Sequence, residues 1–267
     1  MRTFRIFIII VCLGFGAMVT EAFITINNKD SFKPKEAGKG FAVVELFTSE
    51  GCSSCPPADA LVARVQKESA NKPVYILAFH VDYWNRLGWK DVFSSADNTA
   101  RQQQYSRWLN SSEVYTPQAI VNGHTEFVGS EEGTLRKAIQ AGLQKSAATP
   151  LTLSDSRFGG NKASVQYHVE GSTNDASLLV ALVQKNATTK VERGENGGRT
   201  LAHVQIVNKL QTLVLGSRNS GKTDIALPTV FSPEGYEIIA FVQKTSTGEI
   251  TGASKIEFPI GATANSK

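Results

Sequence analysis

Cysteine is scarce in this sequence. The 267 residues include only three cysteines, Cys12, Cys52 and Cys55. So small a number of cysteines excludes the dense disulfide framework on which small secreted proteins depend. A lone C-x-x-C pair also lacks the second pair of cysteines found in structural zinc sites. Because Cys12 lies in an apolar segment that we expect to be removed, Cys52 and Cys55 have only each other as partners within the chain.

Other common features are missing as well. The formal net charge is only +4, and no run of Lys and Arg is long enough to indicate nucleic-acid binding. Hydrophobic residues make up 41% and charged residues 19%, which is ordinary for a globular protein and argues against disorder. The sequence shows no internal repeat and no low-complexity tract. It therefore predicts a folded protein that does not bind nucleic acid.

No apolar run reaches the ~20 residues of a membrane-spanning helix. The run "IFIIIVCLGFGAMV" has 14 residues and follows the basic start "MRTFR". With small residues at Thr20 and Ala22, residues 1–22 have the form of a secretory signal peptide. We therefore expect a periplasmic or secreted protein, which contacts the membrane only if this segment stays uncleaved as an anchor.

Strands and helices alternate over residues 38–148. The runs "FAVVELFTS" and "PVYILAFHV" have the length and apolarity of buried parallel strands. Between them, one helical face carries Ala58, Leu61, Val62 and Val65. Pro56 and Pro57 lack N–H groups, so we expect the regular helix to begin at about Pro57. Strand, helix and strand make a βαβ unit.

An insertion follows the second strand, over residues 82–115. It holds all three tryptophans and a predicted helix from Ala96 to Leu109. The stretch "YTPQAIVNGHTEFVGS" then predicts a hairpin, because Asn122 and Gly123 form a dipeptide that tolerates positive φ. A last helical face is formed by Leu135, Ala138, Ile139, Gly142 and Leu143.

The composition changes near Pro150. Beyond it, short alternating apolar runs are separated by turn residues at spacings typical of an all-β sandwich. We therefore expect a boundary near residue 149 and a β-sandwich-like domain over residues 149–262.

The first half resembles the thioredoxin fold. The resemblance rests on Cys52-Ser53-Ser54-Cys55 after a buried strand and on Thr116-Pro117 before the next strand. In thioredoxin-like proteins a proline at that point is cis and faces the dithiol. The segment "VVELFTSEGCSSCPPAD" resembles sequences of a bacterial family of exported thioredoxin-like proteins of uncharacterised function. The expected fold is therefore an α/β thioredoxin-like domain with an insertion after the second strand, followed by an all-β sandwich-like domain.

The cysteine pair predicts an envelope thiol–disulfide oxidoreductase. At the start of a helix, Cys52 would lie beside free backbone N–H groups and the positive end of the dipole, which favours the thiolate. Cys55, one turn on, is placed to resolve a mixed disulfide, and Pro117 would shape the edge that binds a peptide. This interpretation requires sulfur atoms that are accessible to solvent. Its partners would be protein thiols or disulfides as clients and a redox partner that the sequence does not identify; no cofactor is needed.

Two alternatives use the same cysteines. Cys52, Cys55 and His80 can ligate copper as Cu(I), or zinc, in a metallochaperone. A structural disulfide in an exported binding module is the other alternative, although a bond across so short a loop stabilises little.

A second group of polar residues ends the second strand. Strand alternation places His80, Asp82 and Trp84 on one side. His80 can exchange a proton with a thiol, with Asp82 orienting its ring. The simpler interpretation is a hydrogen-bonded strand-end histidine and an aspartate that caps a turn. The insertion's aromatic residues form a small separate core or line a groove for a client.

One dense polar cluster lies in the C-terminal half. "VERGENGGRTLAH", residues 191–203, contains Glu195, Asn196, Arg199 and His203 between two strands. A glycine-rich polar loop is most often only a connection, and the alternative is contact with the dithiol domain or a partner. His168 and His203 are expected to be strand residues rather than ligands. We interpret this half as a docking or substrate-selecting module.

Overall fold

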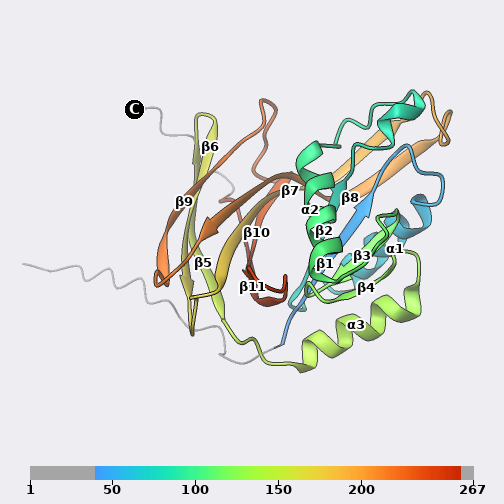
Figure 1. Ribbon diagram of the computed structural model, residues 1–267. Coiled ribbons are helices and arrows are strands. Elements are labelled where there is room, and N and C mark those ends of the chain that lie inside the picture. Colours follow the sequence, from blue (N-terminus) through green and yellow to red (C-terminus); the bar gives the residue numbers. More distant parts are fainter. Residues whose placement is uncertain (1–39, 260–267) are drawn as a thin grey trace, which may run out of the picture. The chain divides into compact units, whose positions relative to one another are not determined.

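The computed structural model describes residues 40–259 (Figure 1). The predicted signal peptide, residues 1–22, and Cys12 lie outside these residues. None of the described helices is long and apolar enough to cross a membrane.

One mixed sheet of eight strands organises the described chain. Its strand order is β11-β10-β7-β8-β2-β1-β3-β4. These strands are β1 (Ala42–Thr48), β2 (Val74–His80), β3 (Gln118–Val121), β4 (Thr125–Val128), β7 (Ala176–Lys190), β8 (Thr200–Val214), β10 (Tyr236–Lys244) and β11 (Ile250–Glu257). The sheet is mostly antiparallel, but β1 pairs in parallel with β2, and β2 in parallel with β8.

The N-terminal elements follow the predicted order. Helix α1 (Pro56–Glu68) connects the parallel strands β1 and β2, and it begins one residue before the predicted start. Strands β3 and β4 form the predicted hairpin, whose turn residues Asn122 and Gly123 have φ of 50° and 75°. The peptide bond between Thr116 and Pro117 is cis, as the resemblance implied.

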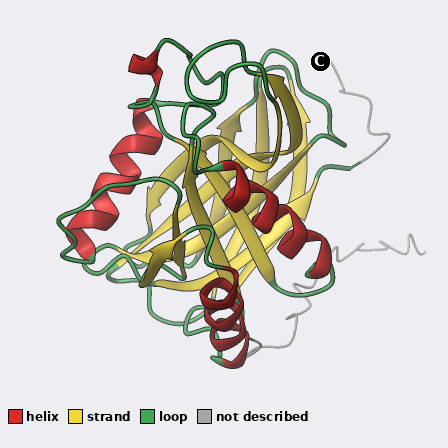
Figure 2. Ribbon diagram, turned by 90° about the vertical axis from the view of Figure 1, so that its right-hand side faces the viewer, coloured by secondary structure: helices red, strands yellow, loops and turns green. Residues whose placement is uncertain are grey.

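Three helices and a short 3-10 helix lie outside the sheet (Figure 2). They include α2 (Ala96–Trp108), α3 (Glu132–Gln144) and η1 (Asn85–Leu87). Alternate residues of β1 separate two cores: Val43 and Phe47 pack with Tyr105 of α2, whereas Val44 and Leu46 pack with α1 and α3. The predicted helical stretches therefore cover the two faces of one strand pair.

The C-terminal half has a core of its own, and it also shares a second core with the N-terminal half. Strands β5 (Leu151–Gly159), β6 (Lys162–Val169) and β9 (Ser220–Ala226) form a separate sheet that packs on β7 and β10. The opposite face of β7 and β10 contributes Leu179 and Phe241 to the core that contains Phe47 of β1. The expected boundary near residue 149 therefore falls within a shared sheet and a shared core (Figure 1).

A buried ion pair within the N-terminal half is hydrogen-bonded to a residue of the C-terminal half across this core. Glu45 of β1 has no exposure, and the Arg101 side chain has 8%. The guanidinium of Arg101 donates to both carboxylate oxygens of Glu45, and Tyr105 also donates to Glu45. Gln243 of β10 donates to Tyr105 and accepts from Arg101. The network is thus fully partnered.

We predict that Arg101→Met destabilises the protein by about 3–5 kcal/mol, because it leaves Glu45 charged and unpaired in the interior. Urea unfolding followed by fluorescence measures this change. Arg136→Met is the matched control, since the Arg136 side chain is 42% exposed in its pairs with Glu68 and Glu132. It should leave the free energy of unfolding nearly unchanged. An equal effect of both substitutions would contradict the assignment.

Candidate functional site

Cys52 and Cys55 are joined by a disulfide in the turn between β1 and α1. The sulfur of Cys52 lies 3.8 Å from the carbonyl oxygen of Thr116, next to the cis bond, and 3.3 Å from the Ser54 hydroxyl. Both cysteines have 0% exposure. The expectation of sulfur atoms accessible to solvent is therefore wrong for this state, because other parts of the chain cover the pair.

The start of α1 offers fewer hydrogen-bond donors than the sequence suggested. Pro56 and Pro57 have no N–H, and the N–H groups of Ala58 and Asp59 both donate to the Cys55 carbonyl. The first turn thus has no free donor of the expected kind among these four residues. Helix α1 can therefore stabilise a Cys52 thiolate only through its dipole. The nearby Ser54 hydroxyl, which precedes α1, can also stabilise it.

His80 and Asp82 do not act together. The Nδ1 atom of His80 lies 2.7 Å from a carboxylate oxygen of Asp91, in the insertion. Asp82 instead accepts a hydrogen bond from the Thr99 hydroxyl on α2. The expectation that Asp82 orients His80 is wrong: the structure assigns that role to Asp91, which also accepts from the backbone N–H of Glu50.

Five ionisable side chains gather behind the cysteine turn. This acid–histidine cluster consists of Glu50, Asp59, His80, Asp91 and His203, each at most 8% exposed. The rings of His80 and His203 have centroids 4.9 Å apart. His203 Nε2 lies 3.3 Å from Glu50, and its Nδ1 lies 3.9 Å from Asp59. His203, a strand residue of β8 as predicted, is therefore central to the site.

Several atoms of this cluster make no hydrogen bond. Nε2 of His80 is one of them, and the ring nitrogens of His203 and Oε1 of Glu50 have only ion-pair contacts. Buried polar atoms are normally partnered, and an unpartnered one costs about 1–3 kcal/mol. The cluster is thus an expensive arrangement directly behind the disulfide.

Burial and mutual charge shift the acid–base properties of the cluster. Burial raises the pKa of Asp59, although His80 and His203 act in the opposite direction. Burial alone would lower the pKa of His80, but the charge and hydrogen bond of Asp91 outweigh it and raise the pKa. The same pairing lowers the pKa of Asp91 despite its burial. His80 and Asp91 thus favour an ion pair, whereas Asp59 keeps its proton to higher pH than a free aspartate does.

The tryptophans of the insertion contact both the site and the main core. Trp84 donates to the Thr116 hydroxyl, beside the cysteines, and Trp89 donates to the Glu50 carboxylate. Trp84 and Trp108 pack against the core that both halves share, so these side chains do not form the separate small core expected from the sequence.

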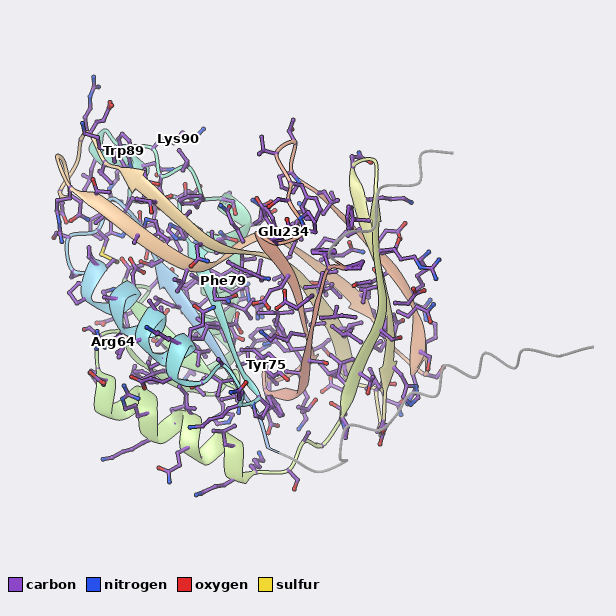
Figure 3. The ribbon with its side chains drawn as sticks, turned by 180° about the vertical axis from the view of Figure 1, so that it is seen from behind. Arg64, Tyr75, Phe79, Trp89, Lys90 and Glu234 are labelled. Atoms are coloured by element: carbon purple, nitrogen blue, oxygen red, sulfur yellow. A yellow bond between two sulfur atoms is a disulfide. The ribbon has the colours of Figure 1, made fainter. Side chains whose placement is uncertain are left out.

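The loop that joins β7 and β8 lies over the cysteine turn. Asn196, fully buried, donates its amide to the carbonyl oxygens of Glu50 and Cys52. Glu195 accepts a hydrogen bond from the Ser53 N–H at 2.9 Å. Figure 3 shows Trp89 beside the loop that joins β7 and β8. A Cβ added to Gly194 in this loop would lie 3.4 Å from the Cβ of Trp89. The alternative interpretation of residues 191–203, contact with the cysteine-bearing half, is therefore confirmed.

Sequence reasoning missed four members of the cluster. Asp59 had a usable signal, because it follows Cys55 by four residues on a predicted helix and so shares its face. His203 had a weak signal, its place in the polar cluster 191–203, whereas Glu50 and Asp91 had none, since their meeting depends on the insertion.

The three residues proposed to bind copper or zinc, Cys52, Cys55 and His80, have other partners in the structure. Cys52 and Cys55 are bonded to each other, and His80 faces Asp91. Over residues 40–259, no group of three or more His, Cys, Asp or Glu side chains is arranged to hold a metal ion.

Comparison with known proteins gives one extensive structural likeness. A crystal structure of a protein from Agrobacterium tumefaciens covers 86% of this chain and 99% of its own, at 30% identity and a TM-score of 0.63. A β-glucosidase from Kluyveromyces marxianus covers 42% of this chain and 14% of its own at 18% identity, with a TM-score of 0.21. A TM-score of that size does not indicate a shared fold. No curated protein matches the chain.

The sequence also matches a described family over most of its length. Residues 43–243 match the pattern of the family described as "Protein of unknown function (DUF1223)". This range includes the cysteine turn, the whole acid–histidine cluster and the loop that covers the disulfide. The chain therefore belongs to the DUF1223 family of proteins of unknown function.

Proposed function

We propose that this protein is a thiol–disulfide oxidoreductase with a thioredoxin-like N-terminal half. The strand order β2-β1-β3-β4, with parallel β1 and β2 connected by α1 and an antiparallel β3–β4 hairpin followed by α3, supports the fold. The cis bond before Pro117, with the Thr116 carbonyl against Cys52, supports the proposed role of this edge.

The observation that carries the proposal is the acid–histidine cluster behind the disulfide. A disulfide across two intervening residues adds little stability by restricting the unfolded chain. The five buried ionisable groups next to it work against stability, because charged forms are desolvated and several atoms make no hydrogen bond. Groups with shifted pKa values in such a place are typical of sites where protons are transferred.

We assign the proton exchange with Cys55 to Asp59, which lies one helical turn further along α1 and whose pKa is raised by burial. When a client thiolate attacks the sulfur of Cys52, the disulfide breaks and Cys55 leaves as a thiolate. Protonated Asp59 then supplies the proton. A second client thiol attacks the mixed disulfide, so that the client becomes a disulfide and Cys52 and Cys55 are left as two thiols.

The reverse sequence reduces a client disulfide by the same steps. Cys52 then attacks, Cys55 resolves, and Asp59 accepts the Cys55 proton. The reduction potential of the pair relative to its redox partner decides the direction. The proposed location in the bacterial envelope rests on the signal-like residues 1–22, and the proposed clients are protein thiols or disulfides.

We predict that Cys55→Ser forms a stable adduct with glutathione at Cys52, because no second thiol remains to resolve it. Mass spectrometry after incubation of the reduced protein with glutathione disulfide detects the adduct. Wild-type protein should return to its internal disulfide. Cys52→Ser is the matched control and should react much more slowly, since Cys55 is the resolving and not the attacking cysteine of this proposal. Two single variants that both fail to react would argue for a passive disulfide.

Asp59→Asn should slow the resolution of the mixed disulfide by about 10²-fold, because Cys55 loses its proton donor and acceptor. Stopped-flow measurement of adduct decay tests this. Asp97→Asn, an exposed carboxylate on α2, is the control and should behave as wild type. Equal decay rates in all three proteins would remove Asp59 from the mechanism.

The same substitution should change how stability depends on pH. In the unfolded chain Asp59 loses its proton near ~3.9, whereas burial keeps it protonated to higher pH in the folded protein. Above that value the folded state binds the extra proton, so this group lowers stability as pH rises. Asp59→Asn should therefore gain stability relative to wild type between pH 4 and neutral pH. Urea unfolding across this range measures the difference, and a constant difference would contradict the raised pKa.

A further inference from the structure

One well-defined loop packs on the turn that carries the disulfide. Residues 191–199 reach the cysteine turn through three hydrogen bonds: Glu195 accepts from Ser53, and Asn196 donates to the carbonyls of Glu50 and Cys52. Ser53 and Ser54 between the cysteines remain exposed. The loop thus lies against the backbone of the turn that carries Cys52.

The loop holds its own shape without the cysteine turn. Val191 and Arg199 are connected by a backbone hydrogen bond of 2.9 Å, and Gly198 donates to Val191 at 2.8 Å. The Arg199 guanidinium donates to the side-chain oxygen of Asn196, which orients the amide toward the cysteine turn. Because these bonds are internal, the loop can leave the turn as a unit and lose only its outward contacts.

The strands behind the loop contain a place where such a movement can start. Strand β10 pairs with β7 only as far as Gln184, so beyond that point β7 pairs with β8 alone. Gln205 of β8 has φ of 55°, a left-handed conformation that is strained for this residue, and its side-chain oxygen has no partner. The register also shifts between Leu182 and Val183. An irregular, two-stranded arm therefore carries the loop.

The loop opposes exchange by its charge as well as by its position. The Glu195 carboxylate is held on Ser53, adjacent to Cys52, and hydrogen bonds from the Ser53 side chain and N–H lower the pKa of Glu195. A fixed negative charge there disfavours a second one on the neighbouring sulfur. Departure of the loop exposes the sulfur and removes this charge together.

We propose that residues 191–199 form a cap that gates the disulfide: the pair exchanges only in molecules whose cap has lifted. This inference rests on the proposed function for its biological purpose, but not for its test. The cap makes the C-terminal half a selector, because a client must displace Glu195 and Asn196 to reach Cys52.

Reduction by dithiothreitol, quenched by acid and followed by thiol alkylation, tests the cap without any client. For wild type, the rate should level off as dithiothreitol is raised, because cap opening becomes limiting. The variants Glu195→Gln and Asn196→Ala should react about tenfold faster or more at low dithiothreitol, because a larger fraction is open. Glu195 is exposed, so its variant should fold even if the buried Asn196 tolerates no change.

Glu192→Gln is the matched control, an exposed carboxylate in the same loop, and should keep the wild-type rate. Wild-type rates in both cap variants, with a linear dependence on dithiothreitol throughout, would overturn the cap. That outcome leaves the glutathione adduct at Cys52 untouched. Conversely, a capped disulfide in a protein that forms no such adduct would overturn the proposed function and retain the cap.

Discussion

Strand β8 lies beside β2, and this parallel contact decides what surrounds the cysteines. Its paired position is Ala78 with Ile206. From there β8 carries His203 into the space behind the turn, and the loop that precedes it brings Asn196 onto the Cys52 carbonyl. Without β8 in this place the cluster would lose its central ring and the disulfide its cover. The C-terminal half is thus part of the site rather than a module attached to it.

The Glu45–Arg101 network and the acid–histidine cluster are both buried, but they differ in how completely their polar atoms are hydrogen-bonded. Glu45 and Arg101 satisfy each other, with further hydrogen bonds from neighbouring side chains, so their network favours one arrangement of the core. The acid–histidine cluster is as deeply buried, but His80 and His203 keep ring nitrogens without a hydrogen bond. The cluster is thus only partly satisfied, although His80 pairs with Asp91 and Trp89 donates to Glu50. We therefore attribute it to proton transfer at the adjacent sulfur atoms.

Local patterns predicted the elements that local physics determines. Apolar runs indicated β1 and β2, and the Asn122-Gly123 dipeptide indicated the hairpin turn. Side chains that meet through distant segments were not predictable: Asp91 approaches His80 because the insertion folds back, and no spacing records that. The prediction of exposed sulfur atoms was wrong for the same reason, since a segment distant in the sequence packs on the cysteine turn. The position of β8 and the fold of the insertion together determined most of what the sequence patterns did not indicate.

A cap that belongs to the same chain acts as a tethered competitor for the cysteine turn. Because the loop cannot diffuse away, its effective concentration at the turn is on the order of millimolar, as for short linkers in general. A client present at lower concentration must therefore bind the turn more tightly than the loop does, or contact surfaces that the loop leaves free. The exposed Ser54 and the edge next to Pro117 are such surfaces. Selectivity then follows from competition, because a thiol that binds only at Cys52 meets the closed loop.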